Sequence, residues 1–295
     1  VNRRWAMEPS SRSPPGRRRP STPLAAGLCL LYDRGMKIVR GLRSPLPSLT
    51  TPVATIGAFD GVHRGHQAVL AETVAWARAL GGEALAVTFD PLPKAVVGSA
   101  EALCITSLDH RLLLLERHGI QVAVVLAFDA ALAALPAEAF VHEVLLDWLG
   151  TRHIVLGFNS TFGRRGEGNA TLLRRFEERG LLEVRTPDPV LHRGGAISST
   201  LIRQAVRDGR LDEAAAMLGR PVALLGTVVP GDQRGRTLGF PTANLDLRHE
   251  VAPPPGVYAT VAVLDGVRHP ALTYIGSRPT FHPEASEPAF EVHLL

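Results

Sequence analysis

The chain has few cysteines and no long apolar run. Cys29 and Cys104 are the two cysteines among its 295 residues. This count excludes a disulfide framework and a cysteine-based zinc site, and it fits a reducing compartment. No segment approaches the ~20 consecutive apolar residues that a membrane-spanning helix needs. We therefore expect a cytoplasmic protein without a membrane partner.

A net positive charge is also lacking outside the N-terminal segment. The formal net charge is +4. Residues 1–35 contain seven Arg and two acidic residues, a net charge of +5, so residues 36–295 carry −1. A nearly neutral body lacks the basic surface that binds nucleic acid. We expect small-molecule substrates and no nucleic-acid partner.

The first 35 residues differ in composition from the rest of the chain. They are rich in Pro, Arg and Ser, a composition that buries too little apolar surface to fold. The apolar stretch PLAAGLCLLY follows several arginines but is barely ten residues long and lacks a cleavage site, unlike a signal peptide. The sequence predicts that residues 1–35 are a disordered extension and that the native start is Met36, where MKIVRGL begins an ordered strand.

Residues 36–220 alternate between strand and helix patterns. TPVATIGAFD is a short apolar run, and the following segment at 66–82 has helical periodicity and ends at two glycines. IQVAVVLAF at 120–128 is continuously apolar, as in a strand that is covered on both faces. This alternation predicts an α/β, Rossmann-like domain with a doubly wound parallel sheet.

From Pro221 onward the helical periodicity fades, and Gly, Pro and short β-branched runs dominate. Two strand patterns flank Asp265-Gly266, a pair typical of a type I′ hairpin turn. AFEVHLL at 289–295 indicates one more strand. Residues 221–295 are therefore expected to form a small antiparallel β-barrel domain.

Two histidines stand at the junction between the first core strand and the next helix, in GAFDGVHRGHQ. Ligands of open α/β sheets bind beyond the carboxyl ends of the strands, and helix N-termini favour phosphate. His63 and His66 would add donors there, and Gly65 lets an anion approach the backbone. A metal site would need a third ligand, which the neighbouring sequence lacks. Two surface histidines at a helix start are the plain alternative.

Several motifs carry a resemblance to a known family. GAFDGVHRGHQAVL resembles the signature of the HxGH nucleotidyltransferase superfamily. VTFDPLP, GFNSTFGRRGEG and ISSTLIR, in this order, are similar to the bacterial bifunctional riboflavin kinase/FAD synthetase family. GTVVPGDQRGRTLGFPTANL, PPGVYATVAV, GSRPTF and FEVHLL resemble its riboflavin kinase half. The resemblance extends over residues 36–295.

For the first domain, the resemblance implies that the FMN phosphate attacks the α-phosphorus of ATP and that pyrophosphate leaves. The histidines would hold the phosphates, the hydroxyls of the Ser-Ser-Thr segment would donate hydrogen bonds, and an arginine would reach the pyrophosphate. A capped helix with a solvated Arg, and a loop-capping Asn, are the plain alternatives. The implied catalytic residues are His63, His66, Ser199 and Arg203, and the implied nucleotide- or flavin-binding residues are Gly57, Phe59, Asp60, Gly61, Asn159, Ser198 and Thr200.

For the second domain, GDQRGRTLGFPTAN is a glycine-rich basic loop that could wrap phosphates, although it is not a Walker A sequence. The resemblance implies that Thr242 and Asn244 bind Mg²⁺ and that Glu291 takes the proton of the ribityl hydroxyl. A glycine-rich hairpin and a solvated edge-strand carboxylate are the plain alternatives. Gly231, Arg236 and Gly239 complete the implied nucleotide-binding set.

The sequence departs from the family pattern in four places. Ala58 replaces the usual Asn, Leu92 replaces a His, and Ser160 replaces an aromatic residue. The family also continues past the position where this chain ends, at Leu295. We expect a C-terminally truncated barrel with an unpaired edge and impaired kinase activity.

The resemblance therefore implies an enzyme that phosphorylates riboflavin to FMN and adenylylates FMN to FAD. Its substrates are ATP, riboflavin and FMN, and its cofactor is Mg²⁺. Two alternatives are a nucleotidyltransferase for another substrate, such as pantetheine phosphate or nicotinate mononucleotide, and a flavin- or nucleotide-binding regulatory protein with decayed catalysis. The oligomeric state is not indicated by the sequence.

Overall fold

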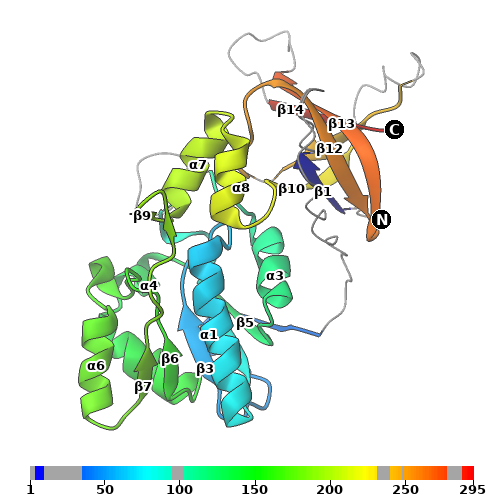
Figure 1. The fold of residues 1–295 in the computed structure, drawn as a ribbon. Coiled ribbons are helices and arrows are strands. Elements are labelled where there is room, and N and C mark those ends of the chain that lie inside the picture. Colours follow the sequence, from blue (N-terminus) through cyan, green and yellow to red (C-terminus); the bar gives the residue numbers. More distant parts are fainter. Residues whose placement is uncertain (1–3, 10–34, 95–102, 231–239, 248, 278–287) are drawn as a thin grey trace. The chain divides into compact units, whose positions relative to one another are not determined.

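The computed structural model describes residues 4–9, 35–94, 103–230, 240–247, 249–277 and 288–295 (Figure 1). The chain divides into two compact units. The first contains residues 34–203 and 216–219, and the second contains the N-terminal strand together with residues 204–215 and 220–295. The predicted domain boundary at residue 220 stays a prediction. Both α7 (Ser199–Arg207) and α8 (Leu211–Leu218) contribute residues to each of the two units.

The first unit is built on a six-stranded sheet in which every neighbouring pair is parallel. The strand order is β2-β5-β4-β3-β6-β7. This arrangement confirms the predicted Rossmann-like parallel sheet. The strands are β2 (Lys37–Arg40), β3 (Val53–Ile56), β4 (Ala84–Phe89), β5 (Val122–Leu126), β6 (His153–Val155) and β7 (Glu183–Arg185).

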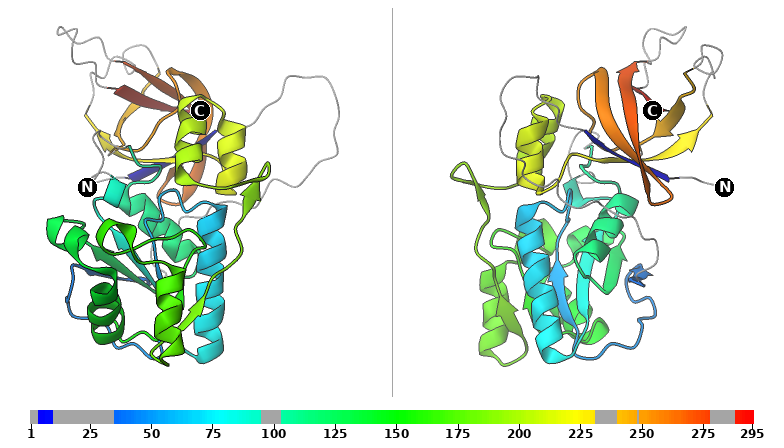
Figure 2. Two further views of the ribbon diagram at one scale, coloured as in Figure 1. Left: turned by 90° about the vertical axis from the view of Figure 1, so that its left-hand side faces the viewer. Right: turned by 45° about the vertical axis from the view of Figure 1, so that its right-hand side comes forward.

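Helices cover both faces of this sheet (Figures 1 and 2). Successive strand residues point to opposite faces. One face packs its side chains, Val53 and Ala84 among them, against α1 (Arg64–Leu80) and α3 (Leu108–Arg117). The other packs Ile56 and Leu85 among others against η1 (Phe140–Trp148) and α6 (Ala170–Glu178). The central strands are therefore apolar throughout because both faces are buried.

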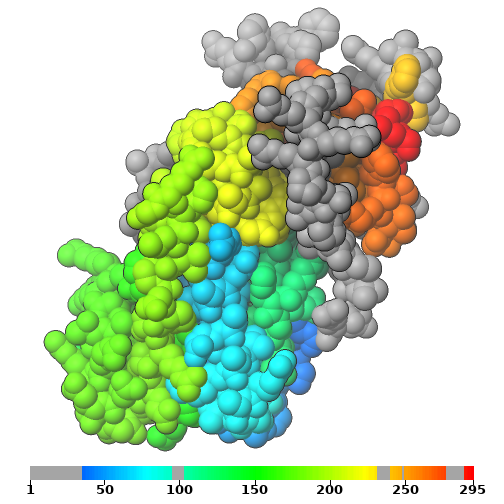
Figure 3. All heavy atoms as spheres, viewed as in Figure 1, coloured from blue at the N-terminus to red at the C-terminus, as the bar shows by residue number. Residues whose placement is uncertain are grey.

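The predicted helix after the two histidines is confirmed as α1. The His63 ring caps its N-terminus, and Gly81 ends it in the left-handed region at φ 65°. Its outer side carries the exposed residues Ala71, Ala75, Arg78 and Ala79 and lies on the surface seen in Figure 3. Among the described residues, none of the helices combines the length and the apolar character needed to cross a membrane.

The segment PAEAFVHEVLLDWLG is helical but is not an α-helix throughout. After the short α5 (Ala137–Ala139) the chain widens into the π-helix η1, and the Leu149 N–H bonds the Val144 carbonyl. Val144 and Leu145 follow Phe140 by four and five residues, and all three are buried. Hydrogen bonds between residues five apart keep them on the side of the helix that faces the sheet. Gly150 follows with φ 62°, in the left-handed region that commonly ends a helix.

Short elements connect the main ones in the first unit. They include α4 (Ala130–Ala134), the 3₁₀ turn η2 (Arg164–Gly166) and a two-stranded ribbon of β8 (Leu191–His192) and β9 (Gly195–Ala196). The ribbon leads directly into α7. The chain thereby returns from β7 to the carboxyl edge of the sheet, where the candidate site lies.

The second unit is an antiparallel β-barrel, as the sequence predicted. Asp265 at φ 49° and Gly266 at φ 81° form the expected type I′ turn between its two longest strands. The barrel is closed in the order β1-β10-β11-β14-β13-β12. Its strands are β1 (Arg4–Pro9), β10 (Leu224–Val229), β11 (Ala243–Asp246), β12 (Gly256–Leu264), β13 (Val267–Ser277) and β14 (Pro288–Leu294).

Strand β1 corrects two expectations. The sequence predicted a disordered segment at residues 1–35 and an unpaired barrel edge, but β1 pairs antiparallel with both β10 and β12. An edge strand exposes backbone N–H and C=O groups that another strand can bind. The composition argument averaged over the whole extension and overlooked RWAMEP, a six-residue segment with no internal Gly or Pro.

Candidate active site

The candidate site lies where the sheet connectivity reverses direction. From β3 the chain proceeds to β4 and β5 on one side, and it later returns to β6 on the other side of β3. Such a switch point is the usual ligand site of an open parallel sheet. A cavity of about 290 Å³ opens there, at the carboxyl ends of β3, β6 and β7.

Residues from six parts of the first unit line this cavity. They come from the end of β3, the start of α1, the segment after β4, the loop after β6, the segment before β8 and the start of α7. The N-termini of two helices therefore meet at one cavity, and their unpaired N–H groups favour an anion. The described lining residues are 56–59, 63, 65, 66, 69, 94, 157–161, 187–190 and 197–200.

Five of the predicted binding residues lie at this cavity and two do not. Gly57, Phe59, Asn159, Ser198 and Thr200 line it, together with the predicted catalytic residues His63, His66 and Ser199. In the described part of the chain, Asp60, Gly61 and Arg203 are absent from the lining. The position of these residues in the sequence does not show whether their side chains reach the cavity.

The two imidazoles form a stacked pair. Their centroids are 3.7 Å apart with an interplanar angle of 18°, and the Phe59 ring meets His66 edge-on at 5.3 Å. The Nδ1 atom of His63 accepts a hydrogen bond from the His66 backbone N–H at 3.3 Å. This acceptor role assigns the proton of a neutral His63 to Nε2.

The His66 ring is held in its neutral form. Burial is the main cause that lowers its pKa well below 6.5, and the nearby His63 and Arg111 add to the effect. The His66 Nδ1 atom is buried and has no hydrogen-bond partner within the described residues. A neutral imidazole can donate one hydrogen bond to a phosphate without bringing a second buried charge into the site.

Acidification is expected to weaken the folding of the first unit partly through His66. In the unfolded chain this ring takes up a proton near pH 6.5, whereas the folded ring stays neutral at that pH. The contribution of His66 to the free energy of unfolding is therefore fully present above this pH. It decreases as the pH drops below this value, by at most about 1.4 kcal/mol per pH unit. Urea unfolding, followed by tryptophan fluorescence between about pH 7 and about pH 5, measures this loss.

The matched variant for this measurement is His66→Phe, which keeps an aromatic ring and removes the titration. We expect the variant to lose less stability on acidification than the parent protein. Trp76 and Trp148 both belong to the first unit and report its unfolding. The same pH dependence in both proteins would contradict a neutral, buried His66.

The start of α7 presents hydroxyl groups to the cavity. Ser198 Oγ accepts a hydrogen bond from the Leu201 N–H at 3.4 Å, which makes Ser198 the cap of this helix. Ser199 Oγ donates to the Asp60 carbonyl at 3.0 Å. Thr200 Oγ1 lies 3.4 Å from the Lys94 Nζ atom. Lys94 is a cation of the cavity wall that the sequence analysis missed, although it directly follows the motif VTFDPLP.

A second residue that the sequence analysis missed is Arg111. It is only 1% exposed, and its Nη1 and Nη2 atoms donate to the carbonyls of Ala58 and Phe89 at 2.8 and 2.9 Å. The guanidinium thus joins the chain leaving β3 to the end of β4. An arginine on the apolar face of α3, next to Leu112 and Leu115, was the signal that could have revealed it.

Two of the departures from the family pattern lie in the cavity wall. Ala58 and Ser160 line it, whereas Leu92 is absent from its described lining. At position 58 the backbone carbonyl is the bonded group, because it accepts from Arg111 and from Thr88 Oγ1. These two contacts do not depend on the side chain that the residue carries.

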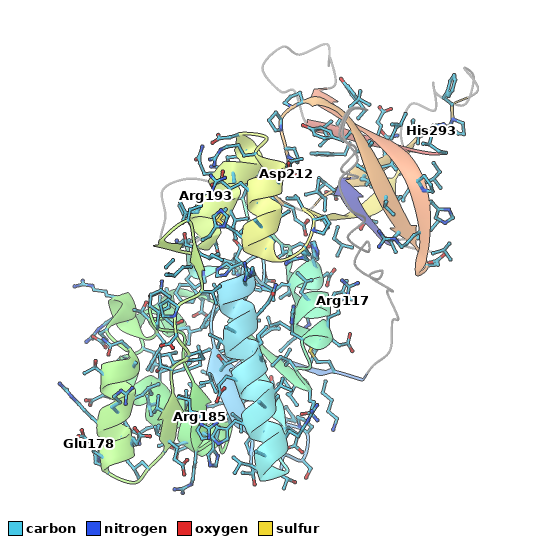
Figure 4. All side chains as sticks on the ribbon, viewed as in Figure 1. Arg117, Glu178, Arg185, Arg193, Asp212 and His293 are labelled. Carbon is cyan, nitrogen blue, oxygen red and sulfur yellow. The ribbon has the colours of Figure 1, made fainter. Side chains whose placement is uncertain are left out.

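The barrel unit brings together the predicted kinase residues that the structure describes. Asn244 on β11 pairs directly with Glu291 on β14, and Thr242 Oγ1 donates to Glu291 Oε2 at 3.2 Å. His293 (Figure 4) lies two residues further along β14 and bonds the Pro241 carbonyl through Nδ1 at 2.8 Å. The predicted phosphate-loop residues Gly231, Arg236 and Gly239 lie outside the described residues.

The donor set of this cluster suits a hard cation. Thr242, Asn244 and Glu291 offer hydroxyl, amide and carboxylate oxygens, the ligand types that Mg²⁺ prefers. In the part of the chain that the structure describes, no group of three His, Cys, Asp or Glu side chains could hold a metal ion by itself. A cation in this cluster would therefore need further oxygens from water or from phosphates.

Comparisons with known proteins agree on both units. The FAD synthetase family model matches residues 47–201, and the riboflavin kinase family model matches residues 218–295. A bifunctional riboflavin kinase/FMN adenylyltransferase of Listeria monocytogenes is 36% identical over 82% of this chain and 77% of its own length. The Escherichia coli protein of the same description is 36% identical over 88% and 83%.

A solved structure extends this similarity to three dimensions. The crystal structure of a macrolide-efflux protein from Streptococcus pneumoniae has a TM-score of 0.75 to this chain at 31% identity. The match covers 88% of this chain and 84% of the other. It supports the α/β and β-barrel architecture described above.

Proposed function

The chain belongs to the bifunctional riboflavin kinase/FMN adenylyltransferase family, and on that basis we propose that it converts riboflavin to FMN and FMN to FAD. The first reaction takes place at the Thr242–Asn244–Glu291 cluster and the second at the cavity beside His63 and His66. ATP, riboflavin and FMN are the substrates. The observation that carries the proposal is the cavity at the switch point, where two helix N-termini and the stacked imidazoles meet.

In adenylyl transfer, an oxygen of the FMN phosphate attacks the α-phosphorus of ATP. The new P–O bond forms while the bond from the α-phosphorus to the bridging oxygen breaks, and pyrophosphate leaves. His63 and His66 donate hydrogen bonds to phosphate oxygens on which negative charge increases, and the N–H groups at the start of α1 and α7 add their dipoles. Lys94, whose Nζ atom lies beside Thr200 at the start of α7, supports the same charge. Asn159, which lines the cavity, would contact the flavin or the nucleotide.

In the kinase reaction, the ribityl hydroxyl of riboflavin attacks the γ-phosphorus of ATP and ADP leaves. Glu291 accepts the hydroxyl proton as the oxygen–phosphorus bond forms. Thr242 and Asn244 would hold Mg²⁺, which neutralises charge on the ATP phosphates when it is bound. The Thr242 hydroxyl bonds Glu291 directly, so the proposed base and the proposed cation site share one hydrogen bond.

Two assays on the purified chain test the proposal. The first measures FAD and pyrophosphate from FMN and Mg²⁺-ATP, and the second measures FMN and ADP from riboflavin and Mg²⁺-ATP. Product in both assays supports the bifunctional assignment. Flavin or ATP binding without turnover would replace it with the regulatory alternative. Adenylylation of pantetheine phosphate or nicotinate mononucleotide in preference to FMN would replace the substrate assignment.

We also propose that the enzyme acts in the cytoplasm and that its partners are small molecules. It binds neither nucleic acid nor a membrane. The near-neutral body of the sequence and its two cysteines support this setting.

A further inference from the structure

Asp60 is a buried acidic residue to which two other segments of the chain bind. It is 2% exposed. Its Oδ1 atom accepts from the backbone N–H groups of Ile105 and Thr106 at 2.8 and 3.1 Å. Its Oδ2 atom accepts from Arg203 Nη1 at 2.7 Å, and its own carbonyl accepts from Ser199 Oγ. One residue thereby joins the loop before His63, the chain entering α3 and the first turns of α7.

The loop that Asp60 anchors has a strained backbone. Phe59, Gly61 and Val62 have φ values of 49°, 82° and 38°, and His63 follows at once. The left-handed region is costly for side chains other than glycine, so the surroundings must hold such a loop in place. Thr106 Oγ1 accepts from the Gly61 N–H at 2.9 Å, next to the Asp60 bonds. The position of the His63 ring therefore depends on the contacts of Asp60.

The same contacts orient the arginine of α7. The Arg203 side chain is 15% exposed, and its Nη2 atom lies 3.4 Å from Thr200 Oγ1 while Nη1 bonds Asp60. Ser199 and Arg203 are four residues apart, on one side of the helix, and both bond Asp60. Helix α7 is thus fixed in rotation as well as in position. This orientation of α7 places the hydroxyl groups of its first turn at the cavity.

The charged groups around Asp60 carry a net positive charge, which favours the binding of an anion nearby. Burial raises the pKa of the Asp60 carboxyl, and the Thr106 N–H and the Arg203 guanidinium oppose this rise. Arg111 also contributes to holding the carboxylate charged. Two arginines around one carboxylate leave a net charge of +1 beneath the proposed phosphate site. Removal of the carboxylate charge would raise this to +2 and release Arg203 from its fixed direction.

From this arrangement we infer that Asp60 is a positioning residue for adenylyl transfer. It acts through Arg203 and the start of α7, which it holds in register with the loop that carries His63. It does not touch the substrate, because its carboxylate is enclosed by protein donors. The inference rests on the proposed function of this cavity and assigns to Asp60 a role different from the nucleotide binding that the sequence resemblance implied.

The decisive variant is Asp60→Asn, which keeps the size of the side chain and removes its charge. Misplacement of reacting groups by about 1 Å costs about 100-fold in rate, so we expect kcat for FAD formation to fall about 100-fold. The KM for ATP should stay the same or decrease, because the local positive charge increases. A merely structural defect would raise this KM. Asp147→Asn, an exposed carboxylate on η1, is the matched control and should retain full activity.

A double-mutant cycle separates action through Arg203 from general loosening of the fold. In the Arg203→Met background, Asp60→Asn should lower kcat by less than about 2-fold, since its partner is already gone. The double variant removes both charges of the Asp60–Arg203 ion pair together, so neither is left without the other. An equal loss in both backgrounds, or an unchanged kcat in Asp60→Asn, would overturn the inference.

ATP binding can be measured independently of FAD formation, so the role of Asp60 and the proposed function can be tested separately. If the parent chain makes no FAD, the proposed function fails. The dissociation constant of ATP, measured by calorimetry, still tests Asp60. The inference expects Asp60→Asn to bind ATP at least as tightly as the parent, and weaker binding would overturn it.

Discussion

Replacement of His63 by asparagine is expected to lower the rate of FAD formation by about 100-fold or more, because removal of one preorganised donor to a transition state commonly costs that much. Asparagine is chosen because His63 also caps α1, through Nδ1 and the His66 N–H. Asn is among the best N-cap residues, so the helix keeps its cap while the imidazole is lost. The measurement is kcat for FAD and pyrophosphate release from FMN and ATP.

His63→Ala provides the comparison for this variant. It removes both the imidazole and the cap, so it should show the same loss of activity and an additional loss of about 1 kcal/mol in the free energy of unfolding. FMN formation from riboflavin should be unaffected in both variants, because that reaction belongs to the barrel unit. If His63→Asn keeps the parent rate of FAD formation, His63 serves only as a helix cap.

The sequence predicted those parts of the site that follow from local pattern. The position of His63 and His66 at a strand-to-helix junction and the turn at Asp265-Gly266 each depend on residues within a few positions of one another. The parallel sheet followed from continuous apolar strands. All of these were confirmed by the structure.

Contacts between distant segments could not be predicted in this way. Asp60 bonds Arg203, which is 143 positions away, and Arg111 bonds Ala58 across 53 positions. A motif shows that Asp60 is near the histidines in sequence, but it does not show that the backbone turns its carboxylate into the protein. Strand β1 was missed for a related reason, because its partners β10 and β12 lie more than 200 residues later in the chain.

Replacement of Glu291 by glutamine is expected to lower FMN formation by about 100-fold or more, the usual contribution of a general base. Glutamine keeps an oxygen that can accept from Thr242 Oγ1, now 3.2 Å from Glu291 Oε2, but it cannot take up the ribityl proton. The measurement is ADP release with riboflavin and Mg²⁺-ATP. Because FAD formation from supplied FMN uses the other unit, its rate should be unchanged, which verifies that the first unit is folded.

Asp212→Asn is the matched control for this prediction, since Asp212 is an exposed carboxylate on α8 in the same unit (Figure 4). It should leave both activities at the parent level. If Glu291→Gln retains the parent rate of FMN formation, the ribityl proton goes elsewhere. His293, two residues along β14, would then be the next residue to replace.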